Sequence, residues 1–204
     1  IVAYAASHTR EPWSDADPTQ AGAIATAVTG HYAISIETLT FSKLLASKPW
    51  MRPLITKVLA ALVTSLERQA AAAARGNAAD ADILRAKAEQ NRERLHTFSA
   101  APPADTLSAM RAQVASYLAE LPAVASGGWL FGETIGSADV VLAVLCARLA
   151  MAGELALLQR SDLREWWNRM QQRPAFDAAD IWTRFHRRRF IAAVLEARHT
   201  PITP

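Results

Sequence analysis

The side chains that could hold a small molecule by hydrogen bonds begin with His31, Tyr32 and Ser35, which lie within about one helical turn of an otherwise apolar stretch. An imidazole and two hydroxyls can each donate and accept hydrogen bonds. An apolar pocket with a few converging polar groups is the common form of a small-molecule site. The sequence therefore leaves two alternatives. Either these residues line a binding pocket, or Tyr32 belongs to the core and His31 is exposed.

A second candidate pair, Trp182 and Arg184, lies in an arginine-rich region near the end of the chain. A guanidinium can bind a carboxylate through two parallel hydrogen bonds, so this pair could hold an acidic ligand. In the alternative, the ring packs in the core and the arginines form the solvated face of a terminal helix. The sequence shows no recognition-helix motif and no aromatic–basic interleaving, which disfavours a nucleic-acid partner. Binding of an anion or a nucleic acid by the arginine-rich region remains a third alternative. The arginines of this region are Arg184, Arg187, Arg188, Arg189 and Arg198.

The sequence predicts no catalytic residue and no metal ligand in this chain. Cys146 lies inside the apolar run from Val140 to Ala147, which favours a buried, inert thiol over a nucleophile. Glu37, Glu133 and Asp139 form no paired-acid arrangement. We also find no Ser-His-Asp set, phosphate loop or metal-ligand spacing.

The composition favours one all-helical domain with a sizeable core. The 204 residues are 51% hydrophobic and 20% charged, and alanine, the strongest helix former, is abundant. A single cysteine excludes an intrachain disulfide, so we expect a reducing, cytoplasmic setting. The longest apolar run is far shorter than the roughly 20 residues that a membrane helix requires, so no membrane partner is expected. No segment alternates with a period of two, as a strand would.

Helical periodicity and end signals divide the chain into segments. Asp17-Pro18-Thr19-Gln20 has the residue types of a helix start, with a capping acid and a proline at the first helical position. Apolar residues then recur at helical spacing from Ile24 to about Ser47. The expected helices span residues 17–47, 52–74, 80 or 82 to 98, 105–121, 137–151, 161–173 and 174–198.

A series of motifs in the last third of the chain resembles a known family. A glycine turn, Gly127-Gly128-Trp129-Leu130-Phe131-Gly132, precedes the helix start Ile135-Gly136-Ser137-Ala138-Asp139. A helix with Trp166 and Trp167 follows, and then Arg173-Pro174-Ala175-Phe176. In this order and spacing, these motifs resemble the C-terminal helical domain of glutathione transferases. The long segment 49–100 is most similar to the dehalogenase-like and ganglioside-induced differentiation-associated branch.

The resemblance implies an all-α, glutathione transferase C-terminal-like bundle with an inserted helical hairpin at 49–100. Residues 1–16 are then a remnant of a preceding thioredoxin-like domain and linker, and 17–204 form the helical domain. That missing domain binds glutathione as co-substrate, so this chain alone lacks the glutathione site. The intact protein is then a dimeric detoxification enzyme, a homodimer that conjugates or dehalogenates small electrophiles. His31, Tyr32, Ser35, Trp182 and Arg184 are the substrate-binding residues. The alternative is a non-catalytic protein-interaction domain of the same fold.

One position departs from the family pattern. The residue three before the motif Asp139 is Gly136, where the family usually has a Ser or Thr that caps the helix. Asp139 can still accept a bond from the cap backbone and face the positive end of the helix. We therefore expect Asp139 to contribute about 1 kcal/mol to stability as a local cap.

Overall fold

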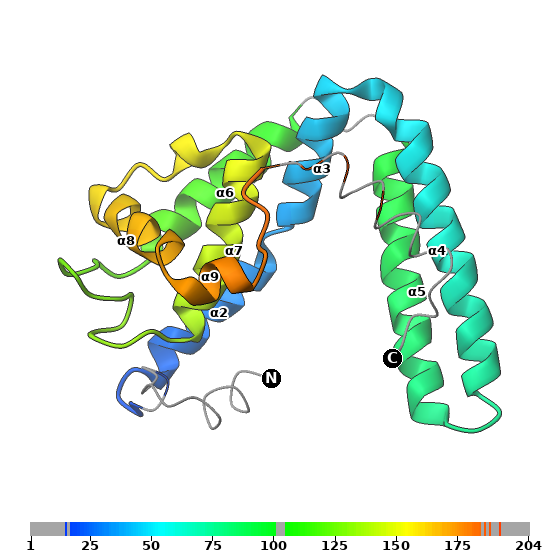
Figure 1. Ribbon diagram of the computed structural model, residues 1–204, viewed down its shortest axis with the longest axis horizontal. Coiled ribbons are helices and arrows are strands. Elements are labelled where there is room, and N and C mark those ends of the chain that lie inside the picture. The colour runs from blue at the N-terminus through cyan, green and yellow to red at the C-terminus, as the bar shows by residue number, and fades with distance from the viewer. Residues whose placement is uncertain are drawn as a thin grey trace. The chain divides into compact units, whose positions relative to one another are not determined.

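All regular structure in the described part of the chain is helical, apart from one isolated bridge between Trp129 and Gly132 (Figure 1). The all-α prediction is therefore confirmed for these residues. None of the described helices combines the length and the apolar composition that crossing a bilayer requires. The computed structural model describes residues 15, 17–100, 105–184, 186, 188 and 192.

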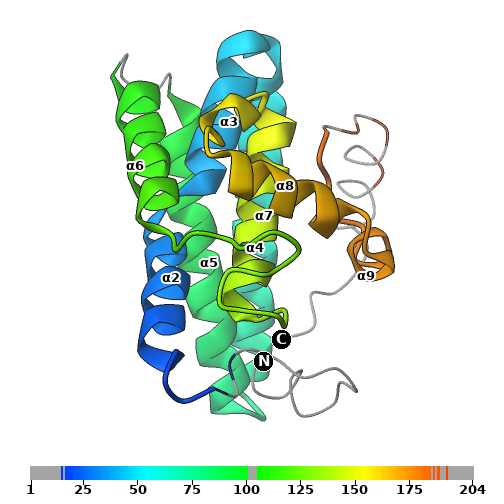
Figure 2. The same ribbon diagram turned by 90° about the vertical axis from the view of Figure 1, so that its left-hand side faces the viewer.

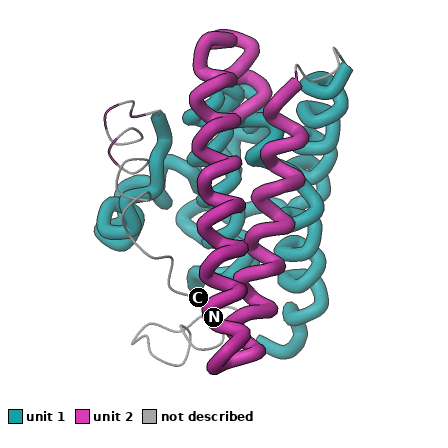
Figure 3. The backbone as a smooth tube through the Cα atoms, turned by 90° about the vertical axis from the view of Figure 1, so that its right-hand side faces the viewer, with its two compact units in different colours: residues 1–40, 105–184 teal, residues 41–104, 185–204 magenta. Residues whose placement is uncertain are grey.

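The chain divides into two compact units (Figure 3). Unit 1 comprises residues 1–40 and 105–184, and unit 2 comprises residues 41–104 and 185–204. Unit 2 thus contains the predicted insertion 49–100. The helix α3, Ile36–Ser47, begins in unit 1 and ends in unit 2.

Unit 1 is a group of helices packed around α7. Figures 1 and 2 show α2, α6 and α7 running beside one another, with α8 against α7. The core includes Leu142, Leu145 and Leu149 of α7, which are completely or almost completely buried. The helices are α2 (Ala21–Ala33), α6 (Thr106–Glu120), α7 (Ser137–Ala152), the 3-10 turn η3 (Leu155–Leu157), α8 (Ser161–Gln171) and α9 (Pro174–Ala178).

The central helix α7 confirms the predicted buried helix of residues 137–151. It ends at a glycine in the left-handed conformation, Gly153 (φ 68°), whose N–H donates to the carbonyls of Leu149 and Ala150. Glycine suits this position because it has no Cβ to strain the left-handed backbone. Most α7 side chains are buried, and Val140 is an exposed exception. The apolar run is therefore explained by a helix with neighbours on nearly every side.

The C-terminal end of α6 is held by an arginine from the start of α8. Arg160 donates to the carbonyls of Leu118, Leu121 and Pro122 at 3.2, 2.6 and 2.8 Å. Asp162 orients the guanidinium through two bonds, at 2.6 and 3.2 Å. The hydrogen bond with Arg160 is the main reason that the pKa of Asp162 falls to about 2. The last carbonyls of a helix have no intrahelical donor, and Arg160 supplies one.

Unit 2 contains a helical hairpin of α4 (Arg52–Ala73) and α5 (Ala78–Ser99), which follows the 3-10 turn η2 (Pro49–Met51). Asn77 caps α5, because its side-chain oxygen accepts the N–H groups of Ala79 and Asp80. At the open end, the Arg52 side chain donates to the carbonyls of Phe98 and Ala100. Two apolar clusters lie within this unit, one around Leu45, Met51, Ile55 and Phe98 and one around Leu66, Ala70, Leu84 and Ala88.

The single helix predicted for residues 17–47 is wrong, because the structure has two helices here. α2 ends at Ala33, Ile34 is extended (φ −83°, ψ 116°), and α3 begins at Ile36. Ile34 and Ile36 are β-branched, which weakens helix formation, and Ser35 forms a local side-chain bond to Thr38 at 2.7 Å. The helical spacing of apolar residues continues through the break between α2 and α3, so this spacing does not indicate where α2 ends.

Two other predicted helix ends are also wrong. Asp17 forms a turn ahead of α2 rather than its cap, because it accepts bonds from Thr19 and Gln20, and the helix begins at Ala21. The last predicted helix, 174–198, is interrupted near its start, because α9 ends at Ala178 and Asp180 then takes a positive φ of 47°. Residues 181–184 are not helical, and most of the remainder of that prediction lies outside the described residues.

Candidate functional site

The side chain of Asp139 joins three parts of the resemblance motif. It is 0% exposed and accepts hydrogen bonds from Gly136 N–H, Leu130 N–H and Trp166 Nε1–H at 2.9, 3.0 and 2.7 Å. These donors belong to the start of α7, to the glycine turn and to α8. Burial raises the pKa of Asp139, and the three bonds act in the opposite direction. The predicted cap bond to Gly136 is present, but the carboxylate also holds two more distant elements.

The remaining motif residues extend this contact network. Trp167 meets the ring of Phe176 edge to face, with their centroids 5.5 Å apart. Arg169 donates to the carbonyl of Gly128 at 2.5 Å, and the Arg173 guanidinium lies 5.2 Å from the centroid of a Trp129 ring. The glycine turn, the start of α7, the tryptophan helix and the segment 173–176 therefore form one connected group in unit 1.

A residue that the sequence reading missed completes the N-terminus of α7. The Ser137 N–H donates to Asp15 Oδ2 at 2.8 Å, and the Ser137 hydroxyl donates to Asp15 Oδ1. Asp15 thus provides an acceptor at a helix start whose cap residue, Gly136, has no side chain. Because Asp15 precedes Ser137 by 122 positions, no local sequence signal could have paired them.

His31 and Tyr32 are adjacent on α2 but differ in burial, because their side chains leave the helix in directions about 100° apart. His31 is 8% exposed, on the core face with Ile24 and Ala27, whereas Tyr32 is 73% exposed. The alternative in which Tyr32 is core and His31 exposed is therefore wrong on both counts. Their rings meet edge to face, with centroids 5.5 Å apart. Ser35 is also exposed, and its hydroxyl bonds to Thr38 at the start of α3.

The buried face at this end of α2 is fixed by α6. The Tyr117 hydroxyl donates to the Ala27 carbonyl at 3.1 Å, and Gln113 donates to the Ala33 carbonyl at 3.1 Å. Burial raises the pKa of Tyr117 to about 12. A Cβ at Gly30 would lie 3.2 Å from the Tyr117 ring, so glycine allows the close approach of α2 and α6 here. Sequence spacing alone did not identify Tyr117 as part of this region.

His31 carries an unusual polar atom for a core position. Its Nδ1 is buried and has no hydrogen-bond partner among the described residues. Burial lowers the pKa of His31, so its imidazole is neutral at pH 7. A buried polar group without a partner costs about 1–3 kcal/mol. This part of α2 therefore contains one buried hydrogen-bonding atom without a partner among the described residues, on the residue next to the exposed Tyr32.

We expect His31→Phe to flatten the dependence of stability on pH. Because the folded-state pKa lies below the unfolded value of about 6.5, wild type loses stability as the pH falls below that value, until the folded pKa is reached. Phe cannot be protonated, so the variant should not lose stability in this way as the pH falls. At pH 7.5 the variant should be at least as stable as wild type, because the substitution removes a buried polar atom without a partner. Urea unfolding at pH 5.0 and 7.5 measures both effects, with the exposed-residue change Tyr32→Phe as control. Parallel pH profiles for wild type and His31→Phe would contradict the burial of a neutral imidazole.

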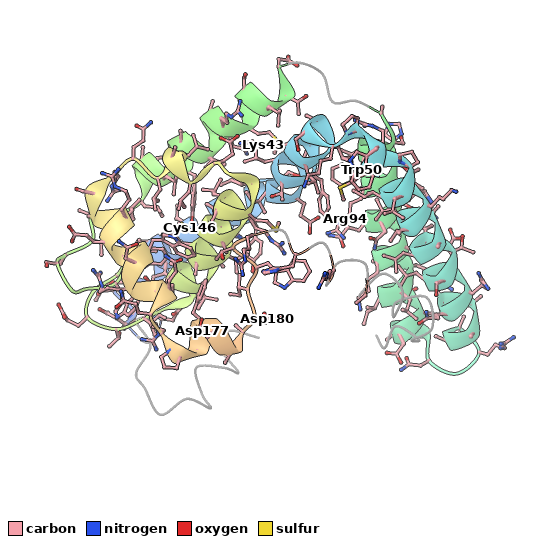
Figure 4. All side chains as sticks on the ribbon, turned by 45° about the horizontal axis from the view of Figure 1, so that its top comes forward. Lys43, Trp50, Arg94, Cys146, Asp177 and Asp180 are labelled. Atoms are coloured by element: carbon pink, nitrogen blue, oxygen red, sulfur yellow. The ribbon has the colours of Figure 1, made fainter. Side chains whose placement is uncertain are left out.

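The other candidates lie elsewhere in unit 1. Trp182 is half-buried and Arg184 is exposed, both beyond α9, and the role predicted for them stays a prediction. Cys146 is 0% exposed in α7 (Figure 4), and burial raises the pKa of its thiol, so the predicted buried cysteine is confirmed. Across the described ranges, no three His, Cys, Asp or Glu side chains are grouped so that they could hold a metal ion.

No protein-family model, curated protein or solved structure matches this chain.

Proposed function

We propose that this chain is the substrate-binding helical domain of a glutathione transferase-like protein. The observation that carries the proposal is the Asp139 carboxylate, whose bonds to Leu130, Gly136 and Trp166 connect the motifs of the resemblance. A resemblance based on scattered residues is stronger when the same residues contact one another, because the contacts give a physical reason for their order and spacing. Such motifs hold a fold in place, and in this proposal the substrate contacts the exposed face of α2 instead.

The exposed face of α2 suits an uncharged, apolar substrate. Residues 18–36 contain no Asp, Glu, Lys or Arg, and the outward side of the helix consists of small residues with Tyr32 near its end. An aromatic electrophile could stack on the Tyr32 ring and bond to its hydroxyl. In this proposal Ser35 supplies a further polar contact, and Trp182 and Arg184 contribute from the region after α9. His31, which the sequence also suggests for this role, lies on the core face of α2 and not on the exposed face.

The reaction that we propose is the attack of the glutathione thiolate on that electrophile. Lowering the pKa of a thiol is the central requirement of such chemistry. We assign this step, and most of the glutathione contacts, to a thioredoxin-like domain, as the resemblance implies. The helical domain would then orient the acceptor and contribute to a homodimer.

The second candidate function is a protein-interaction domain without catalysis. The same observation on α2 favours it, since an exposed helix face without charges, ending in an exposed tyrosine, also suits contact with another protein. The two functions differ in one measurable respect, because only the enzyme consumes glutathione.

The test is glutathione conjugation by the intact gene product, assayed with a chloro-aromatic acceptor. We expect turnover above the uncatalysed rate, and we expect Tyr32→Phe and Arg184→Ala each to raise the KM for the acceptor at least about threefold while the KM for glutathione is unchanged. Tyr117→Phe is the matched control, because it removes a tyrosine hydroxyl that bonds within the core. This control should lower thermal stability and leave both KM values unchanged. Absence of turnover would overturn the enzymatic proposal and favour the interaction domain.

A further inference from the structure

The turn between α3 and α4 exposes residues 46–50 as a continuous run. The run ends at Trp50, which lies in the 3-10 turn η2 and is 57% exposed (Figure 4). Pro53 and Lys57, which are also exposed, follow Trp50 at intervals of three and four residues. These intervals place side chains on the same face of a helix. Trp50 and Lys57 therefore share one exposed face at the start of α4.

The charge around this turn is positive over a long stretch of the chain. Residues 38–66 contain no Asp or Glu, whereas four of them are Lys or Arg. Lys48 and Lys57 are exposed, and the other two are partly buried. A single exposed aromatic ring is common on protein surfaces, but here it coincides with a region of one charge sign. The four cations are Lys43, Lys48, Arg52 and Lys57.

This charge distribution is confined to one end of the hairpin. At the open end, where Arg52 bonds to the carbonyls that follow α5, the last turns of α5 add Arg94 and His96 and one acid, Glu93. Further along the hairpin, bases and acids are mixed and pair with one another, as Arg92 does with Glu67 and Glu89. The open end is therefore the basic end.

We propose that Lys48, Trp50, Pro53 and Lys57 form a face that attaches unit 2 to the surface of an anionic bilayer. Tryptophan is enriched at the level of lipid headgroups, where its ring is apolar and its N–H remains hydrated. Lysine can lay its stem along apolar surface and place its ammonium group beside lipid phosphates. Such attachment requires no spanning helix, so it is compatible with the short apolar runs of this chain.

Two observations favour a bilayer over other anionic partners. Nucleic-acid surfaces usually stack successive bases on several aromatic rings, but the other described phenyl rings of unit 2, Phe41 and Phe98, pack against each other with centroids 5.2 Å apart. A peptide is normally held in a groove, whereas this face is an exposed turn that suits a flat surface. The inference goes beyond the proposed function, because its residues belong to unit 2 and it requires no glutathione chemistry.

The test is co-sedimentation of the full chain with lipid vesicles. We expect binding to phosphatidylcholine vesicles that contain about 30% phosphatidylserine and no binding to phosphatidylcholine alone, because the attraction depends on a negative surface potential. Raising the salt from about 0.1 M to about 0.5 M should weaken binding at least about threefold, since salt screens exposed charges. Absence of binding to the anionic vesicles at low salt would overturn the proposal.

Substitutions locate the contact. Lys48→Gln and Lys57→Gln should each weaken binding about fivefold, the factor that one lysine near an anionic leaflet contributes. Trp50→Ala should weaken it at least about fivefold, and acyl-brominated lipids should quench the tryptophan emission of wild type more than that of Trp50→Phe. The matched controls are Arg75→Gln, an exposed cation at the closed end of the hairpin, and Ile83→Ala, an exposed apolar residue of α5. Both should bind like wild type.

Thermal unfolding verifies that each variant is folded, and the lysine variants carry the test if Trp50→Ala is unstable. Equal vesicle binding by wild type, Lys48→Gln and Lys57→Gln would assign the binding to another cationic region and overturn the proposal. A fluorescent single-stranded RNA distinguishes the alternative partner. If the lysine variants weaken RNA binding but leave vesicle binding unchanged, the face binds nucleic acid and the proposal is wrong.

Discussion

Replacing Asp139 with Ala should destabilise the protein by about 3–5 kcal/mol, which exceeds the value of a local helix cap several-fold. The carboxylate is fully buried, and its removal leaves three N–H donors without an acceptor, two on the backbone and one on Trp166. Each buried unpaired donor costs about 1–3 kcal/mol, and breaking a buried charged network costs about 3–5 kcal/mol. For a chain of this length, we expect the Tm to fall by roughly 10 °C.

The comparison variants make this result specific. Asp139→Asn keeps the shape of the side chain but presents an NH₂ group to some of the donors, so it should lose about 2 kcal/mol. Asp177→Ala removes an exposed acid from the first turn of the short helix α9 (Figure 4) and should change stability by less than about 0.5 kcal/mol. Urea unfolding followed by circular dichroism measures all three. Equal midpoints for Asp139→Ala and Asp177→Ala would mean that Asp139 does not hold the glycine turn and α8 together.

Replacing Arg160 with Ala should have the next largest effect, a loss of about 2 kcal/mol. The guanidinium donates to three carbonyls at the end of α6 and pairs with Asp162, but it is partly accessible, so water can replace some of these bonds. Arg160→Lys keeps the charge and loses the planar fork, so it should recover less than half of the loss. Arg164→Ala, an exposed arginine on the same helix, is the control and should be nearly neutral.

The stabilisation that Arg160 provides through its pairing with Asp162 should also depend on pH. The folded-state pKa of Asp162 is about 2, below the unfolded value of about 3.9, so its stabilising effect is complete above pH 4 and is lost as the pH falls toward 2. In Arg160→Ala the main cause of the lowered pKa is absent, so the stability lost between pH 4 and 2 should be smaller than in wild type. An identical loss of stability between pH 4 and 2 in the two proteins would contradict the pairing of Arg160 with Asp162.

The sequence predicted α7 well because its signals are local. The apolar run, the acid in its first turn and the glycine after its end all lie within a short window, and each has a direct physical meaning. The contact between Asp15 and Ser137 and the bond from Trp166 to Asp139 were not predictable in this way. Each contact depends on how segments that are distant in the sequence pack together. The residue types involved do not indicate which partner they will contact.

The error at His31 and Tyr32 has a simple geometric origin. Ile24, Val28 and Tyr32 recur at helical spacing, and a core stripe through them assigns the larger side chains to the core. The buried face instead runs through Ile24, Ala27, His31 and Ile34, shifted by about one residue around the helix. A small alanine gives a weak core signal, and Tyr117 occupies the space beside it. Which side of α2 is buried, and therefore whether His31 or Tyr32 faces the core, thus depends on how α2 packs against α6.

The hairpin of unit 2 affects how unit 1 can fold, because unit 1 is built from two stretches of chain that residues 41–104 separate. The Arg52 side chain bonds to the carbonyls of Phe98 and Ala100, so the start of α4 and the end of α5 meet. A formed hairpin therefore shortens the effective loop between the two stretches, and the entropy of closing a loop grows with its length. The contacts of α4 with α5 are local in sequence and can form early, before the long-range contacts of unit 1. The insertion would then speed the assembly of the unit that it interrupts.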